Sequence, residues 1–190
     1  MMKLLIVSGS KRKGNSEFVA NVLTQYLKDL NKSIIVNTVK LSELNINFCT
    51  GCLECDETKR CCIEDDITNI VDTVADSDGI VFISPVRWSL ISGEMKTFLD
   101  RLNPLAMSMS MAGKKCITIV IGQSEANEGD SVIAASASFK AFADNAEMIV
   151  CKQIEIFSCL NADDICNNVS DIDKCKEACD VLIDGICEEH

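Results

Sequence analysis

Four cysteines in the second quarter of the chain have a spacing that suits metal chemistry. They form the pattern C-x2-C-x2-C-x5-C and are Cys49, Cys52, Cys55 and Cys61, with Cys62 directly after the last. Thiolates at two-residue intervals can wrap one compact iron–sulfur cubane. Structural zinc more often uses two separated C-x2-C pairs, so three cysteines in tandem suit zinc less well. Free thiols or a disulfide are the other interpretations of this cysteine loop, which spans about residues 48–64.

The composition restricts where such cysteines can work. The chain has 12 cysteines among 190 residues, and its formal net charge is −11. After Lys3 the N-terminus has only four consecutive apolar residues, too few for the apolar region of a signal peptide. We therefore expect a cytoplasmic protein whose clustered cysteines bind metal or are redox-active. The acidic charge argues against nucleic acid or an anionic membrane as a partner.

A second candidate site is the phosphate loop, residues 9–16 with the sequence GSKRKGNS, between an apolar run and a helical pattern. A helix N-terminus offers free backbone N–H groups and the positive end of the dipole to a phosphate. Asn15 stands where a P-loop has its lysine, so ATP or GTP is disfavoured, and G-x-G-x-x-G is absent. A loop for one phosphate monoester remains, with FMN as the obvious carrier; an ordinary basic turn is the alternative. The candidate ligand residues are Ser10, Arg12, Lys13, Gly14, Asn15 and Ser16.

A third segment, SPVRWS at residues 84–89, follows another apolar run and precedes a helix that Ser92 is expected to cap. Its proline-stiffened backbone suits contact with the edge and face of a flavin ring. The candidate contacts are Pro85, Val86, Arg87, Trp88 and Ser89, with Gly122 from a further loop. Trp88 is the only tryptophan, and a core or subunit-interface anchor is an equal alternative for it.

These loops need a framework, which the hydrophobic pattern predicts. Apolar, β-branched runs occur at residues 3–8, 33–39, 79–84, 117–121 and 148–157. Segments with apolar residues at helical spacing lie between them and after the last. Alternating strands and helices predict an α/β fold: a doubly wound, flavodoxin-like, five-stranded parallel sheet with strand order 2-1-3-4-5. We expect one domain over residues 1–190, with a flexible surface connection at Met107, Met109 and Met111.

Taken together, the phosphate loop, the SPVRWSLISGEMKTFLDRL segment and the cysteines resemble the NAD(P)H-dependent FMN reductase family, and more narrowly its iron–sulfur flavoprotein branch. The resemblance covers about residues 1–125. It implies FMN held by residues 10–16 and 85–89, NAD(P)H as donor, and a homodimer or homotetramer. It also implies a 4Fe–4S cluster, with Cys61 preferred over Cys62 as fourth ligand because of its spacing to Asp65. Arg87 departs from the aromatic residue common in relatives, and we expect it near the flavin, favouring a negatively charged reduced form.

The expected function is an oxidoreductase that passes electrons from NAD(P)H through the flavin to a small-molecule or protein acceptor. No catalytic acid–base residue is required, because the cofactor carries the chemistry. The single histidine, His190, ends the chain and is expected to be frayed, which excludes a Cys–His or Ser–His nucleophile from the interior. The alternatives are a non-enzymatic electron carrier with an acidic surface and a metal- or thiol-based sensor without flavin.

Overall fold

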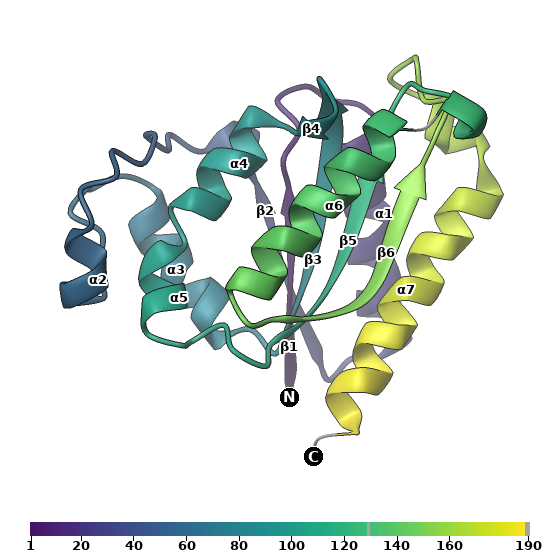
Figure 1. Cartoon of the computed structure of the whole chain (residues 1–190). Coiled ribbons are helices and arrows are strands. Elements are labelled where there is room, and N and C mark those ends of the chain that lie inside the picture. Colours follow the sequence, from purple (N-terminus) through teal and green to yellow (C-terminus); the bar gives the residue numbers. More distant parts are fainter. Residues whose placement is uncertain (129, 189–190) are drawn as a thin grey trace.

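The computed structural model describes residues 1–128 and 130–188, so His190 lies outside the described residues. Five parallel strands form the central sheet in the order β2-β1-β3-β5-β6 (Figure 1). They are β1 (Met2–Ser8), β2 (Ile34–Lys40), β3 (Gly79–Arg87), β5 (Lys115–Ile121) and β6 (Ile149–Ile156). This is the predicted order 2-1-3-4-5. The labels differ because a short strand, β4 (Leu90–Ile91), pairs antiparallel with the end of β3.

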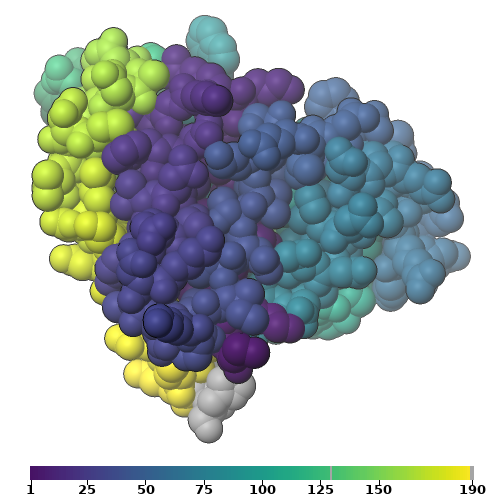
Figure 2. All heavy atoms as spheres, turned by 180° about the vertical axis from the view of Figure 1, so that it is seen from behind, coloured from purple at the N-terminus to yellow at the C-terminus, as the bar shows by residue number. Residues whose placement is uncertain are grey.

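Helices cover both faces of the sheet, which makes the central strands almost entirely buried. One face carries α1 (Asn15–Leu30) and α7 (Val169–Cys187), seen side by side in Figure 2. The other face carries α3 (Ile67–Asp76), α4 (Gly93–Asp100) and α6 (Asp130–Asn145). Two short helices, α2 (Glu54–Thr58) and α5 (Asn103–Met107), were not predicted. No helix within residues 1–128 and 130–188 is long and apolar enough to cross a membrane.

The core forms one apolar cluster on each side of the sheet. Phe82 of β3 stacks on Phe139 of α6 with ring centroids 5.8 Å apart. Cys175 and Cys179 of α7 are buried against the opposite face, as predicted from their spacing. The prediction of a flexible surface connection is wrong for Met111, which is fully buried among α4, α6 and sheet residues because its side chain fills the core beyond α5.

The loops that follow β1 and β3 meet at the carboxyl edge of the sheet. These two strands are neighbours, and the Gly9 N–H donates to the Ile83 carbonyl oxygen at 2.8 Å. Ser92, the predicted cap of α4, accepts a hydrogen bond from the Met95 N–H. Its hydroxyl also donates to the Gly9 carbonyl oxygen at 2.5 Å. The start of α4 is therefore fixed to the phosphate loop at the switch point of the doubly wound sheet, where such folds bind ligands.

Candidate cofactor sites

The phosphate loop leads directly into the N-terminus of α1. Gly14 precedes the helix with extended backbone, and no side chain caps the helix there. The first intrahelical bond runs from the Phe18 N–H to the Gly14 carbonyl oxygen. The N–H groups of Asn15, Ser16 and Glu17 therefore have no acceptor within the helix, and they share its positive dipole end. The Ser10 hydroxyl donates to the Arg12 carbonyl oxygen at 2.8 Å and closes the loop beside them.

The Asn15 side chain makes hydrogen bonds that the sequence did not predict. Its amide nitrogen donates to the Asn161 carbonyl oxygen at 2.7 Å, and its amide oxygen accepts from the Ile165 N–H at 3.2 Å. The side chain thus ties the start of α1 to a segment far along the chain. Sequence spacing gave no indication of this link.

An open cleft of about 460 Å³ lies beside this helix end, within the usual size range of ligand pockets. Its lining residues are Arg12, Val86, Arg87, Trp88, Ser89, Gln123, Ser124 and Ser131. It continues into a smaller pocket whose further residues are Ser10, Asn15, Ser16, Pro85, Ile121, Gly122 and Cys159. The structure therefore gathers all of the candidate flavin residues except Lys13 and Gly14, which lie in the loop outside both linings. Ser131 and Cys159 were missed, because neither belongs to a recognisable motif.

The tip of this cleft is a strained two-residue turn between β3 and β4. Trp88 and Ser89 both have positive φ angles, 47° and 63°, and Arg87 pairs with Leu90 across the turn. This is the backbone required by type I′ hairpins, which ordinarily contain Asn and Gly. Trp88 is 99% exposed, so a core anchor is the wrong interpretation of it. Strained, exposed residues beside a cleft are typical of functional sites.

Ser89→Gly is expected to stabilise the protein by about 1 kcal/mol, because glycine adopts a positive φ without the steric cost of a Cβ. For a chain of this length, the melting temperature is expected to rise by about 2–4 °C in a thermal unfolding experiment. Ser170→Gly is the matched control. Ser170 lies in the first turn of α7, and the same substitution there is expected to lower the melting temperature. Equal changes in melting temperature for Ser89→Gly and Ser170→Gly would contradict backbone strain at Ser89.

Gly122 is required by close packing at the floor of the cleft. A Cβ at this position would lie 2.5 Å from Cγ2 of Val132 and 3.2 Å from Cγ2 of Val86. Gly122→Ala is therefore expected to cost about 1–3 kcal/mol of unfolding free energy, as overpacking does. Urea unfolding of Gly122→Ala, Val132→Ala and the double variant checks this. The double variant is expected to be more stable than the sum of the single effects predicts, and strict additivity would contradict the clash.

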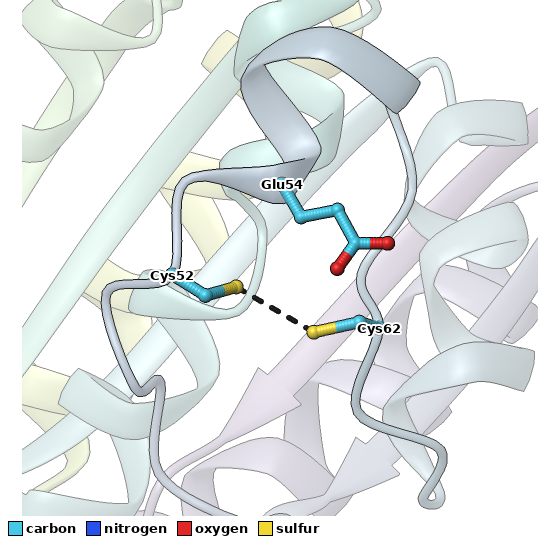
Figure 3. Close-up of side chains that lie close together, drawn as sticks. All are labelled: Cys52, Glu54 and Cys62. Carbon is cyan, nitrogen blue, oxygen red and sulfur yellow. Dashed lines mark hydrogen bonds between the residues drawn. The ribbon is translucent and has the colours of Figure 1, made fainter.

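The cysteine loop forms a separate site near the C-terminal end of α4. All five cysteines of the loop line one cavity together with Arg101 and Asn103. The sulfurs of Cys52 and Cys62 lie 3.5 Å apart, with the Glu54 side chain beside them (Figure 3). Within the described residues, these three side chains are the group whose ligand atoms lie within 4.8 Å of one another. Cys62, which the sequence disfavours as fourth cluster ligand, is therefore in contact with Cys52.

Hydrogen bonding makes two of these thiols unequal. The backbone N–H of Glu54, and then the thiol of Cys62, lower the pKa of Cys52. The same sulfur–sulfur contact raises the pKa of Cys62 to about 11. Cys55 is buried, and its sulfur accepts a hydrogen bond from the Asn103 side-chain amide at 3.0 Å. The loop thus presents a set of sulfur ligands of which one is predisposed to be a thiolate.

A buried ion pair holds both ends of the cysteine loop. Arg101, the residue after α4, donates to the carbonyl oxygens of Asn47 at 2.8 Å and Ile63 at 2.9 Å. Its two Nη groups also contact both carboxylate oxygens of Asp65, at 2.7 and 3.1 Å. The side chains of Arg101 and Asp65 are 0% and 2% exposed. The loop therefore closes upon the C-terminal end of α4.

This position differs from the expected one. Because the cysteine loop follows β2, the sequence predicts that it lies at the same sheet edge as the phosphate loop. α4 begins at that edge, where Ser92 contacts Gly9, and the cysteine loop is held at its opposite end by Arg101 (Figure 1). The two candidate sites are thus connected by one helix of eight residues, a span of about 12 Å.

A doubly wound sheet with a phosphate-type helix N-terminus at its switch point defines the flavodoxin-like class. Two solved structures with this fold are a flavone reductase and an NAD(P)H:quinone oxidoreductase from Methanothermobacter marburgensis. The first is 19% identical, with a TM-score of 0.74, covering 100% of this chain and 65% of that one. The second is 14% identical, with a TM-score of 0.69, covering 93% of this chain and 96% of that one. At these identities the likeness concerns the fold alone.

The family model of the NADPH-dependent FMN reductases matches residues 2–158, and the chain belongs to this family. An iron-sulfur flavoprotein of Archaeoglobus fulgidus is 35% identical over 122 residues, which are 63% of this chain and 54% of the relative. An iron-sulfur flavoprotein of Clostridioides difficile is 32% identical over 122 residues, 62% of this chain and 53% of the relative. The chain therefore spans about half the length of these curated relatives.

Proposed function

We propose that the chain binds FMN in the cleft at the carboxyl edge of the sheet and oxidises NAD(P)H there. One observation carries the proposal: the uncapped N-terminus of α1 and the cleft lined by residues 86–89 are contiguous, so that a phosphate group and an attached ring system fit together. The family to which the chain belongs supports FMN as this ligand.

Each group in the site has a task in this proposal. The backbone N–H groups of Ser16 and Glu17 bind the phosphate, and the Arg12 side chain at the cleft entrance adds positive charge. The backbone of Pro85 and Val86 forms the wall that faces the ring. The Trp88–Ser89 turn shields one end of it from water. When bound, FMN supplies the acceptance of a hydride from the nicotinamide and the onward release of electrons.

We further propose that the cysteine loop holds a 4Fe–4S cluster through Cys49, Cys52, Cys55 and Cys61. All four sulfurs line one cavity, and thiolates are the ligands that such clusters use. The relatives from A. fulgidus and C. difficile are named iron-sulfur flavoproteins, which supports an iron–sulfur centre of some kind in this loop. When bound, the cluster supplies one-electron transfer. The acceptor is then a small molecule or a redox protein.

The test is the absorption spectrum, with iron and sulfide analysis, of protein purified without oxygen. Flavin absorbance and about four iron atoms per chain are expected, together with steady-state oxidation of NAD(P)H by the FMN-loaded protein. If the protein bound flavin but did not oxidise NAD(P)H, the proposed function would change from an enzyme to an electron carrier. Protein that is colourless and takes up no added FMN would overturn the whole proposal. Protein that takes up FMN but contains no iron would contradict only the proposed cluster.

A further inference from the structure

Arg101 is bound on one edge only, although it is among the most deeply buried residues of the chain. Its relative exposure is 1%, and its Nη1 and Nη2 groups are fully used by Asp65, Asn47 and Ile63. Within residues 1–128 and 130–188, its Nε–H has no hydrogen-bond partner. Buried donors in native proteins are nearly always paired, so this N–H calls for an acceptor that the protein alone does not provide.

The residue that carries this unpaired N–H borders the cavity of the cysteine loop. Arg101 lines that cavity together with the five cysteines. Cys61 lines this cavity and stands two residues before Ile63, whose carbonyl oxygen accepts from Nη2 of Arg101, whereas Cys62 contacts Cys52. Asp65 contacts the Nη groups, so its carboxylate does not occupy the Nε edge.

We propose that Arg101 is a positioning residue for the cluster: when the cluster is bound, its Nε–H donates to the Cys61 thiolate, and its charge stabilises the reduced cluster. This inference rests on the proposed 4Fe–4S cluster. Hydrogen bonds to the sulfurs and the charge around a cluster set its reduction potential, so a donor and a cation at one ligand raise that potential. The same contact distinguishes two adjacent cysteines, because it holds Cys61 as the cluster ligand and leaves Cys62 outside.

The other charges near the cavity do not cancel this effect. Asp65 contacts both Nη groups of Arg101, at 2.7 and 3.1 Å, so its carboxylate lies at the end of the guanidinium away from Nε. Asp100 lines the cavity and is paired with the exposed Lys96 on α4. Glu54 lies with Cys52 and Cys62. Arg101 is thus the cation that the cavity lining contains, facing carboxylates that are solvated or paired.

The experiment compares Arg101→Gln and Arg101→Lys with wild-type protein, all prepared without oxygen and loaded with FMN. Redox titration, followed by visible absorbance and the EPR signal of the reduced cluster, gives the potential of the one-electron couple. For Arg101→Gln, the ratio of reduced to oxidised cluster at fixed potential is expected to fall about tenfold, which is a shift of 59 mV to more negative values. Arg101→Lys retains the charge but lacks Nε, and an intermediate shift of about threefold is expected.

Lys140→Gln is the matched control, since it removes one positive charge from an exposed position on α6, and neither Lys140 nor its partner Asp144 lines the cysteine cavity. Its cluster potential is expected to equal that of wild type. Cys61→Ser is expected to lose iron, and Cys62→Ser is expected to keep it. FMN content reports folding in every variant. Should Arg101→Gln not accumulate with bound FMN, Arg101→Lys decides the question.

The outcomes separate this inference from the proposed function. Wild-type protein that binds FMN but no iron would remove the cluster itself. Wild-type protein with a cluster, combined with Arg101 variants that keep the wild-type potential, would overturn only the role of Arg101. A Cys62→Ser variant without iron beside an iron-loaded Cys61→Ser variant would also overturn it. A negative shift in both Arg101 variants, absent from Lys140→Gln, supports it.

Discussion

Asp65→Ala is expected to lower the free energy of unfolding by about 3–5 kcal/mol, the usual cost of removing one partner of a buried ion pair. The substitution leaves the Arg101 guanidinium charged and buried without its carboxylate. It also removes the acceptor of the Asn47 N–H, which Asp65 binds at 2.8 Å, and so releases one end of the cysteine loop. Urea unfolding of the FMN-loaded protein, followed by circular dichroism, measures the change.

Asp100→Ala is the matched control for this prediction. Asp100 pairs with Lys96 within α4, but the two side chains are 43% and 62% exposed. Exposed pairs of this kind contribute about 0–1 kcal/mol, so the control is expected to change stability little. A second control replaces both partners, as Asp65→Leu with Arg101→Met, and is expected to recover most of the loss. An Asp65→Ala variant as stable as Asp100→Ala would contradict the structural role of the pair.

The contribution of Asp65 is also expected to depend on pH. Burial alone would raise the pKa of Asp65, but hydrogen bonds from Arg101 and from the N–H groups of Asn47 and Ile67 outweigh it and lower the pKa. A carboxylate with a lowered folded-state pKa stabilises the protein above its unfolded pKa of about 3.9. The stability difference between wild type and Asp65→Ala is therefore expected to be constant from pH 7 to 5 and to shrink below about pH 4. Urea unfolding at a series of pH values measures this.

The fold could be predicted from the sequence because local and long-range preferences agree. The apolar runs and the helical spacing between them suffice for a parallel sheet, and strand order follows from the doubly wound rule. Ser92 could be identified as a helix cap from its position before Glu94 and the apolar spacing of α4. The phosphate loop could likewise be placed, because it follows the first strand directly.

The Asp65–Arg101 pair could not be predicted in the same way. The two residues are 36 positions apart, and charged side chains are almost always exposed unless they are paired. In the sequence, Asp65 was used only for its spacing to Cys61, which favoured Cys61 over Cys62 as the fourth cluster ligand. The predicted position of the cysteine loop, at the sheet edge of the phosphate loop, was wrong for the same reason. The strand order predicts only the edge at which the loop leaves β2. The contacts of Arg101 with Asn47 and Ile63, which hold the loop at the far end of α4, leave no pattern in the sequence.

The Trp88–Ser89 turn illustrates another limit. Two-residue hairpins are recognised by Asn-Gly or related pairs, and Trp-Ser gives no such indication. The chain tolerates positive φ at both positions because β4 pairs with the end of β3 and the cap of α4 follows at once. Backbone strain that is maintained by neighbouring elements cannot be recognised from the types of the strained residues.

Arg12→Glu is expected to weaken FMN binding at least about 100-fold. Two unit charges 4 Å apart interact by about 1 kcal/mol even in bulk water, and a phosphate monoester carries about −1.5 to −2 charges at pH 7. Reversing the charge of Arg12 therefore costs about 3 kcal/mol or more, and every 1.4 kcal/mol is tenfold in affinity. The side chain is exposed and at the cleft entrance, so the fold is expected to remain intact. Quenching of flavin fluorescence on titration measures the dissociation constant.

Two comparisons test whether the loss of FMN affinity arises from the phosphate group. Riboflavin lacks that group, so its affinity is expected to be nearly the same for wild type and Arg12→Glu, whereas FMN affinity falls. Lys28→Glu makes the same charge change in the last turn of α1, about 20 Å along the helix, and is expected to leave FMN binding within about twofold of wild type. If Arg12→Glu weakened riboflavin and FMN equally, the α1 N-terminus would not be the phosphate site. The helix dipole and the free N–H groups of Ser16 and Glu17 would then need another ligand.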